Sequence, residues 1–345
     1  MLRLPQFELT EPATLAEACA LLAEHGDQAQ LIAGGTDLLP NMKHELFTPR
    51  VVISLAKLRE LHGLCVESDG TLVLGAMTSL DTLAHDERVR ARAPALAQAA
   101  GLVAGPQLRR MGTLGGNVML DTRCQWYNQT YFWRSALGFC LKKDGSACHV
   151  VAGGAKCVAA ASNDTAPALM SLDAMLVFQG GAGFHGGPGR RTLAIDELYT
   201  ADGIHNKSSR AEILVEVRVP PVPPGHRGAY GKLRERGSID FPLLGLAARV
   251  DLSPAGEVVA AALCAVALQA RPLRLQKAIR PLLGTRPGTP AFRSALESAG
   301  ELARKQCHPL ANIPGDPDYR REMVPVYVRR TLTAAVEGTG PVHHI

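Results

Sequence analysis

The stretch LIAGGTDL, residues 31–38, places two adjacent glycines beside a threonine, directly after a short apolar run that predicts a β-strand. A second stretch, GTLGGN at residues 112–117, repeats the paired glycines beside a threonine. Such turns let consecutive backbone N–H groups approach an anion, and the hydroxyl adds a further donor. Together the two turns suggest diphosphate-binding loops. Neither follows G-x-G-x-x-G or the Walker sequence, and each turn taken alone is better interpreted as a plain tight turn.

The segments around these turns predict an α+β protein. Thr14 and Glu17 form an S/T-x-x-E capping box before a helix that Gly26 ends, and residues 50–56 then predict a strand, which together indicate a β-α-β opening. Hairpins are predicted around Asp69 and over 249–268, and helices follow the second one. We expect a domain over 1–220, made of a βαβ-type subdomain (1–56) and a larger mixed subdomain (57–220). A proline-rich linker leads to a second domain, 225–338, of antiparallel sheet with helices.

Composition restricts the classes of function. The chain of 345 residues carries a formal net charge of +5, and its basic residues are scattered, so nothing predicts nucleic-acid binding. The N-terminus lacks the basic and apolar regions of a signal peptide. The longest apolar run, Val258–Leu268, is far shorter than the ~20 residues of a membrane span. We therefore expect a cytoplasmic protein with no membrane partner.

Four of the 8 cysteines lie close together, with the spacing C-x15-C-x7-C-x8-C. They are Cys124, Cys140, Cys148 and Cys157. Cytosolic thiols stay reduced, so metal or cluster ligation is favoured over disulfides. Four thiolates suit an iron–sulfur cluster or zinc, but zinc sites usually pair their ligands as C-x2-4-C, which is absent from this spacing. A cluster is the favoured interpretation, with zinc and inert or redox-active thiols as alternatives.

The surroundings of these cysteines suggest a small independent core. Six aromatic residues lie between the first two cysteines and are expected to pack around the site. They are Trp126, Tyr127, Tyr131, Phe132, Trp133 and Phe139. His149 is expected to be a surface or packing residue. The remaining cysteines, Cys19, Cys65, Cys264 and Cys307, are expected to be buried apolar residues.

Four separated motifs, LIAGGTDLLPNMK, GTLGGNVML, NDTAPALMSLDA and YGKLRERGSIDFPLLGLAA, resemble the FAD-binding medium subunit of the molybdenum hydroxylases. This is the superfamily of xanthine dehydrogenase and carbon monoxide dehydrogenase, and the resemblance covers about residues 5–338. It implies FAD bound by two pyrophosphate loops, an aspartate at the nucleotide end, a lysine near the flavin and a packed apolar residue. These positions are Leu31, Ile32, Ala33, Gly34, Gly35, Thr36, Asp37, Leu38, Thr113, Gly115, Gly116, Asn117, Asp164, Lys232 and Leu214. For Asp164, a helix cap is the alternative. Val103 and Ala104 stand where a relative places an aromatic residue beside the ring, which is a departure.

The cysteine-containing insertion, residues 121–160, resembles that of the β subunit of the 4-hydroxybenzoyl-CoA reductases. This resemblance implies a 4Fe-4S cluster ligated by the four clustered cysteines. It also implies a molybdopterin-containing large subunit with the substrate site, a 2Fe-2S small subunit and a dimer of heterotrimers. Electrons would pass from reduced ferredoxin through the cluster and FAD, and no residue of this chain would be catalytic. The alternatives are a flavin subunit of another hydroxylase, acting on a purine, aldehyde or aromatic substrate, and a zinc-stabilised scaffold that only binds FAD.

Basic residues outnumber acidic ones in the insertion, which predicts a positive surface that an acidic ferredoxin would recognise. The basic residues are Arg123, Arg134, Lys142, Lys143 and Lys156. The alternative is that each is an ordinary solvated side chain.

Overall fold

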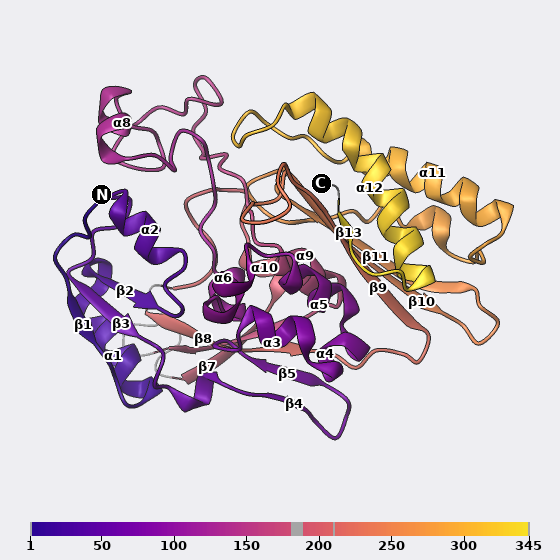
Figure 1. Ribbon diagram of the computed structural model, residues 1–345, viewed down its shortest axis with the longest axis horizontal. Helices are drawn as coiled ribbons and strands as arrows, with labels where there is room; N and C mark the ends of the chain where they lie inside the picture. Colours follow the sequence, from indigo (N-terminus) through magenta and orange to yellow (C-terminus); the bar gives the residue numbers. More distant parts are fainter. Residues whose placement is uncertain (1, 181–188, 210, 344–345) are drawn as a thin grey trace.

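The computed structural model describes residues 2–180, 189–209 and 211–343. Three sheets follow one another along the chain, each with its own helices (Figure 1). A small βαβ-type part comes first, a larger mixed part second and a mostly antiparallel sheet with helices last. The predicted α+β fold class is confirmed. No helix in the described part of the chain is both long and apolar enough to cross a membrane.

The first sheet is parallel, with the order β1-β3-β2. Its strands are β1 (Glu8–Thr10), β2 (Ala29–Ile32) and β3 (Val51–Ser54), and its helices are α1 (Leu15–His25), η1 (Gly26–Gln28) and α2 (Leu38–Lys43). The hydroxyl of Thr14 accepts the N–H of Glu17 at 3.2 Å, and the Glu17 carboxylate accepts the N–H of Ala13 at 2.8 Å. The capping box is thus confirmed, although the Glu17 carboxylate accepts from Ala13, the residue before the N-cap Thr14, and not from the N-cap itself. The first glycine turn joins β2 to α2.

The second sheet has the order β4-β5-β8-β6-β7 and is antiparallel throughout. Its strands are β4 (Leu64–Val66), β5 (Leu72–Gly75), β6 (Met175–Gly180), β7 (Gly189–Ala194) and β8 (Glu212–Val219). Its helices are η2 (Arg59–Leu61), α3 (Leu80–His85), α4 (Glu87–Arg92), α5 (Pro94–Gly101), α6 (Pro106–Met111), α7 (Leu114–Val118), α9 (Thr165–Ser171) and α10 (Ile195–Leu198). The helical region after the first hairpin breaks at Asp86 as well as at Pro94, because the Asp86 carboxylate caps α4 by accepting the N–H of Arg88 at 2.9 Å.

The third sheet has the order β12-β11-β10-β9-β13. Its strands are β9 (His226–Leu233), β10 (Leu244–Leu252), β11 (Val258–Val266), β12 (Leu273–Arg274) and β13 (Val342–His343). It is accompanied by η3 (Arg280–Leu282), α11 (Pro290–Arg304) and α12 (Pro317–Glu337). Successive β10 residues enter different cores: Ala247 packs with α5 and α9, whereas Leu246 and Ala248 pack with α11 and α12. Helices therefore cover both faces of this sheet, and one face joins it to the second part of the protein.

The insertion, residues 121–160, leaves the second part between α7 and α9 and contains one short helix, α8 (Tyr131–Ala136), in the part of the chain described. Its base is closed by a two-way backbone bridge between Arg123 and Ala160, with both N···O distances 2.7 Å. It extends away from the sheets beside α2 (Figure 1).

Candidate functional site

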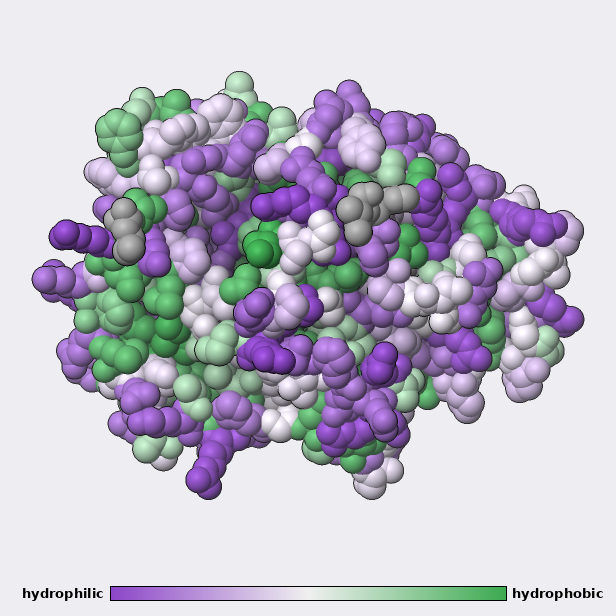
Figure 2. All heavy atoms as spheres, viewed as in Figure 1, coloured by the Kyte–Doolittle hydropathy of each residue, from purple (hydrophilic) through white to green (hydrophobic). Residues whose placement is uncertain are grey.

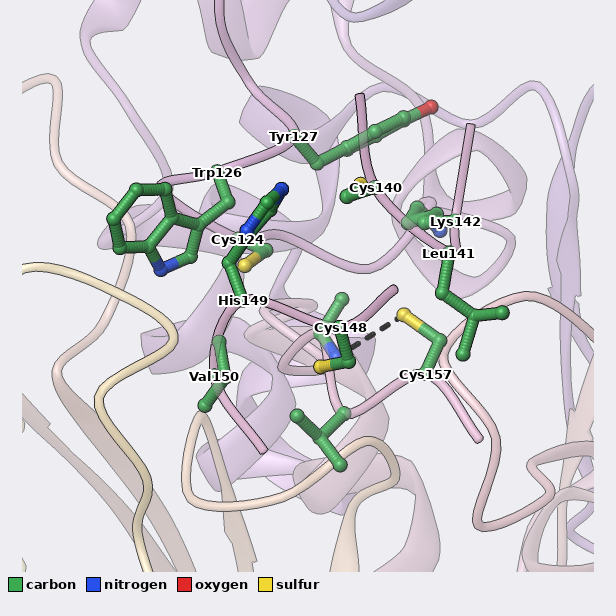
Figure 3. A pocket seen from close by; sticks show the side chains of 12 residues that line it. Cys124, Trp126, Tyr127, Cys140, Leu141, Lys142, Cys148, His149, Val150 and Cys157 are labelled. Atoms are coloured by element: carbon green, nitrogen blue, oxygen red, sulfur yellow. Dashed lines mark hydrogen bonds between the residues drawn. The ribbon is translucent and has the colours of Figure 1, made fainter. Parts of the chain in front are cut away.

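The four clustered cysteines, which are up to 33 positions apart in sequence, line one cavity in the insertion (Figure 3). Cys124, Cys140 and Cys157 are buried, and Cys148 is half-buried. The rest of the lining is Trp126, Tyr127, Leu141, Lys142, His149, Val150, Val158 and Ala159. The structure therefore brings together the cysteines that the sequence singled out. In the described part of the chain, no three His, Cys, Asp or Glu side chains converge tightly enough to hold one metal ion.

These thiols are surrounded mainly by apolar residues, and two of their sulfurs also accept hydrogen bonds. Burial raises the pKa of Cys124 to about 11 and also raises the pKa of Cys157. Backbone N–H groups donate to two of the sulfurs, from Val151 to Cys148 at 3.5 Å and from Ala159 to Cys157 at 3.4 Å. Such bonds stabilise thiolate charge, and a bound metal would have to displace the protons.

The aromatic residues form only part of the expected core. Tyr127 is buried, and the rings of Trp126 and Trp133 pack at a tilt, with 6.0 Å between their centroids. Phe132, however, is 82% exposed, and Tyr131 is also exposed, because α8 lies on the surface of the insertion. The prediction of a closed aromatic core was therefore wrong for α8.

His149 fits the predicted surface or packing role. It is exposed, and its Nε2 lies 2.5 Å from the carbonyl of Phe139. Its ring packs at a tilt against Trp126, with 5.3 Å between the ring centroids. Among the other cysteines, Cys19, Cys264 and Cys307 are buried as expected, but Cys65 is exposed.

The predicted basic surface over the cysteines is wrong, because three of its five residues are buried and paired. Arg134 has a side chain only 1% exposed and forms an ion pair with Asp144 at 3.3 Å. The Lys142 side chain is 5% exposed and pairs with Asp121 at 2.7 Å. Arg123 pairs with Asp37 and lies over the ring of Phe241. Lys143 and Lys156 are the two basic residues that remain near the surface. The Nζ of Lys143 also lies 3.3 Å from a carboxylate oxygen of Asp144.

The two glycine turns lie against each other. A Cβ atom built on Gly34 would lie 1.7 Å from the carbonyl oxygen of Met111, the residue before the second turn. On Gly112, a Cβ would meet the hydroxyl of Thr36 at 3.6 Å. Gly34 is therefore required for the approach of the first loop to the second, which the sequence did not reveal.

The first loop offers backbone donors in a row. Within the described residues, the N–H groups of residues 33–37 have no acceptor in the protein. Gly35 has a φ of +71°, so the chain reverses there in the left-handed region. Consecutive free N–H groups in such a turn form an anion-binding concavity, which fits a diphosphate.

The second loop is more fully bonded. Thr113 caps α7 by accepting the N–H of Gly116 at 3.1 Å. The Asn117 side chain accepts the hydroxyl of Thr165 at 2.6 Å, which fixes the loop to the start of α9. Gly115 lies against Ala76, where a Cβ would come within 2.8 Å. Gly116 is exposed and thus accessible to a ligand.

Asp164 and Lys232 form a buried ion pair, 3.0 Å apart, with side chains 3% and 0% exposed. Tyr230 donates its hydroxyl to the same carboxylate at 2.8 Å. Burial raises the pKa of Asp164 and lowers that of Lys232, and each partner's charge opposes the effect. The side chain of Asp164 makes no capping bond to α9, so the alternative role as a helix cap is wrong.

Lys232 also donates to the carbonyl of Leu102 at 3.0 Å, at the start of the segment 102–104. In that segment Ala104 has a φ of +43°, and its carbonyl accepts the N–H of Ile239 at 3.1 Å. The buried pair therefore fixes the segment that the resemblance implies lies beside the flavin. Leu214, in β8, is 6% exposed and belongs to the main core of the second part.

Comparison with known families covers almost the whole chain. The FAD-binding domain in molybdopterin dehydrogenase matches residues 5–222, and the C-terminal domain of the CO dehydrogenase flavoprotein matches residues 229–335. The chain belongs to the FAD-binding medium subunits of the molybdenum hydroxylase family. It is an oxidoreductase subunit, as the resemblance implied.

Individual members of this family align over nearly their full length. The carbon monoxide dehydrogenase medium chain of Hydrogenophaga pseudoflava is 32% identical over 335 residues, 96% of this chain and 97% of the relative. The xanthine dehydrogenase FAD-binding subunit of Escherichia coli O157:H7 is 28% identical over 337 residues, 95% of each chain. A solved structure of the Hydrogenophaga enzyme, lacking the Mo-pyranopterin moiety, matches with a TM-score of 0.77 at 30% identity, over 96% of this chain and 98% of that one.

Because the chain belongs to a family of FAD-binding subunits, we conclude that this subunit binds FAD. The free donors of residues 33–37 fit the diphosphate of that cofactor, whose flavin supplies one- and two-electron chemistry when bound. The assignment of individual contacts to the residues named from the sequence stays a prediction. Sequence reasoning missed Tyr230 and Met111 and placed Lys142 on the surface, because no local pattern marks a residue that becomes important only through a distant partner.

Proposed function

We propose that this chain is the FAD and 4Fe-4S electron-transfer subunit of a molybdenum-dependent 4-hydroxybenzoyl-CoA reductase. Cys124, Cys140, Cys148 and Cys157 would hold the cluster, which supplies one-electron transfer when bound. The assembly would remove the phenolic hydroxyl as water, with two electrons and two protons, to give benzoyl-CoA. The observation that carries the proposal is that these four thiols surround one cavity.

The chemistry of the cavity supports a cluster more than a single zinc ion. Four thiolates distributed around a shared space match the outer ligands of a cubane, whereas zinc draws four sulfurs to about 2.3 Å from one point. Apolar residues limit solvent access, and two backbone N–H groups already donate to sulfur.

The cavity is joined directly to the first FAD loop, which supports electron transfer between the two. Arg123, next to the ligand Cys124, forms an ion pair with Asp37 of that loop. Leu46, just beyond α2, packs in one apolar cluster with Cys124, Cys140 and Cys157. Arg134 donates to the carbonyl of Glu45 at 3.0 Å. The insertion is thus anchored to the element that follows the flavin loop.

The partners in this proposal are a molybdopterin-containing large subunit and a 2Fe-2S small subunit, as a dimer of heterotrimers, with reduced ferredoxin as donor. The names of the relatives as a medium chain and an FAD-binding subunit support membership of a larger assembly. Because three of the basic residues are buried, the ferredoxin proposal rests on the resemblance of the insertion and not on surface charge.

A second candidate is the flavin subunit of another molybdenum hydroxylase, which the carbon monoxide and xanthine dehydrogenase relatives favour. The purified assembly should reduce 4-hydroxybenzoyl-CoA with a low-potential donor. Oxidation of carbon monoxide, a purine or an aldehyde without that reduction would establish the second candidate instead.

Metal analysis tests the cluster itself. Anaerobically purified protein should contain about four iron and four acid-labile sulfide per chain. Cys140→Ser should abolish the cluster absorption while FAD stays bound, because the flavin loops lie outside the insertion. Cys65→Ser, at an exposed cysteine outside the insertion, is the matched control and should retain both cofactors. Stoichiometric zinc without iron would favour the scaffold alternative.

A further inference from the structure

The cysteine cavity contains a lysine that no ligand role explains. Lys142 lines the cavity two residues after Cys140, yet its side chain is only 5% exposed (Figure 3). A buried ammonium is costly unless it is paired and hydrogen-bonded. Negative charge on the four neighbouring sulfurs, when they act as thiolate ligands, would explain why a cation is buried beside them.

Three contacts fix the position of this ammonium. Its Nζ lies 2.7 Å from a carboxylate oxygen of Asp121, 2.9 Å from the hydroxyl of Thr122 and 2.5 Å from the carbonyl of Gly203. It also lies 4.8 Å from the centroid of the Tyr127 ring, within cation–π range. All three N–H groups of the ammonium therefore have an acceptor, and the side chain is held in one place.

The same contacts attach a distant loop to the cysteines. Gly203 donates its N–H to the carbonyl of Cys157 at 2.9 Å. A Cβ on Gly203 would lie 2.8 Å from the Cys157 sulfur, so the loop backbone lies against the thiol. Lys142 connects this loop to the insertion through the carbonyl of the same glycine.

The charge of Lys142 is not cancelled at the cavity by its partner. Lys142 lines the cavity, whereas Asp121 does not and its side chain is 28% exposed to solvent. The Nζ of Lys142 donates to the carbonyl of Gly203, whose backbone lies against the Cys157 sulfur. The cationic end of the pair thus acts on the sulfur ligands, and the anionic end is closer to water, which screens it.

We propose that Lys142 is a positioning residue of the cluster site, whose buried ammonium raises the reduction potential of the iron–sulfur cluster held by the four cysteines. The inference rests on the proposed function. Reduction adds one electron to a cluster that already carries negative thiolates, so a fixed cation stabilises the reduced state more than the oxidised state. Asp121 acts in the opposite direction and moderates the effect.

The test compares variants of the full chain, purified anaerobically with its partner subunits. Lys142→Met should keep about four iron per chain and show a midpoint potential shifted negative, measured by redox titration with detection of the reduced 4Fe-4S signal by electron paramagnetic resonance. Lys142→Arg should keep a potential close to that of the unaltered protein. Lys143→Met removes a neighbouring, more exposed charge and is the matched control without a shift. An unchanged potential in the iron-replete Lys142→Met variant would overturn the inference.

If Lys142→Met does not retain iron, Asp121→Asn provides a second test of the same inference. This variant retains the lysine and removes the opposing charge, so the midpoint should shift positive. A potential that is unchanged or more negative in Asp121→Asn would overturn the inference. Absence of iron from the unaltered chain would instead overturn the proposed function and the inference with it, so the two failures are distinguishable.

Discussion

Replacing Gly34 with alanine should disrupt the FAD site without touching the ligand directly. The new Cβ would lie 1.7 Å from the carbonyl oxygen of Met111 and 2.4 Å from its carbonyl carbon. An ordinary carbon–oxygen contact is about 3.3 Å, so the first loop and the end of α6 must separate. The obstacle is backbone, which cannot rotate away as a side chain can.

The expected cost follows from the size of this overlap. Overpacking in a well-packed region usually costs about 1–3 kcal/mol, and a backbone obstacle places Gly34→Ala at the upper end of that range. Because the free N–H groups of residues 33–37 are expected to face the diphosphate together with the second loop, separation of the loops should also reduce FAD content severalfold. Flavin absorbance per chain and urea denaturation measure the two effects.

Gly101→Ala is the matched control. Gly101 is the last residue of α5, and a Cβ there would meet the Cβ of Ala84 at 3.6 Å, an ordinary contact. Alanine in place of a helical glycine should be neutral or stabilising by up to about 1 kcal/mol, with full FAD content. Full flavin occupancy and unchanged stability in Gly34→Ala would refute the argument that contact between the two turns builds the site.

Two further predictions concern buried charges outside the insertion. Lys232→Met should lower the free energy of unfolding by about 3–5 kcal/mol in urea denaturation, because it leaves the Asp164 carboxylate buried without its cation. The double variant with Asp164→Asn should recover part of this loss. A Lys232→Met variant as stable as the unaltered protein would contradict the pairing. Burial raises the pKa of Asp251, but hydrogen bonds from His226 and Arg249 outweigh it and hold that pKa below the ordinary 3.8. The contribution of Asp251 to stability should therefore be present above about pH 4 and be lost as the pH falls through its lower folded pKa. The difference in melting temperature between the unaltered protein and Asp251→Asn should accordingly narrow in acid. A difference in melting temperature that is independent of pH would rule out this contribution of Asp251.

Local features of this protein could be predicted from its sequence because they depend on neighbouring residues. The capping box at Thr14, the hairpin at Asp69 and Gly70 and the antiparallel pair β10 and β11 all formed where expected. Their signals are caps, turns and periodicity, which act over a few positions. The grouping of the four cysteines was predicted for a different reason: reduced thiols concentrated in one insertion are ligands of choice for a metal or cluster.

Burial and long-range pairing were decided only by the tertiary structure. Lys232 and Lys142 are lysines, a residue type that by itself indicates a surface position, yet both side chains are buried because acceptors from distant segments surround them. Phe132 and Cys65 show the reverse, since each is apolar in sequence and exposed in the fold. Periodicity states which face of an element is apolar, but whether that face is covered depends on elements far away in the chain. The sequence by itself therefore determined the capped helix, the hairpins and the set of cysteines, and the packing of three sheets and one insertion decided which charges are buried beside the cysteines and the glycine turns.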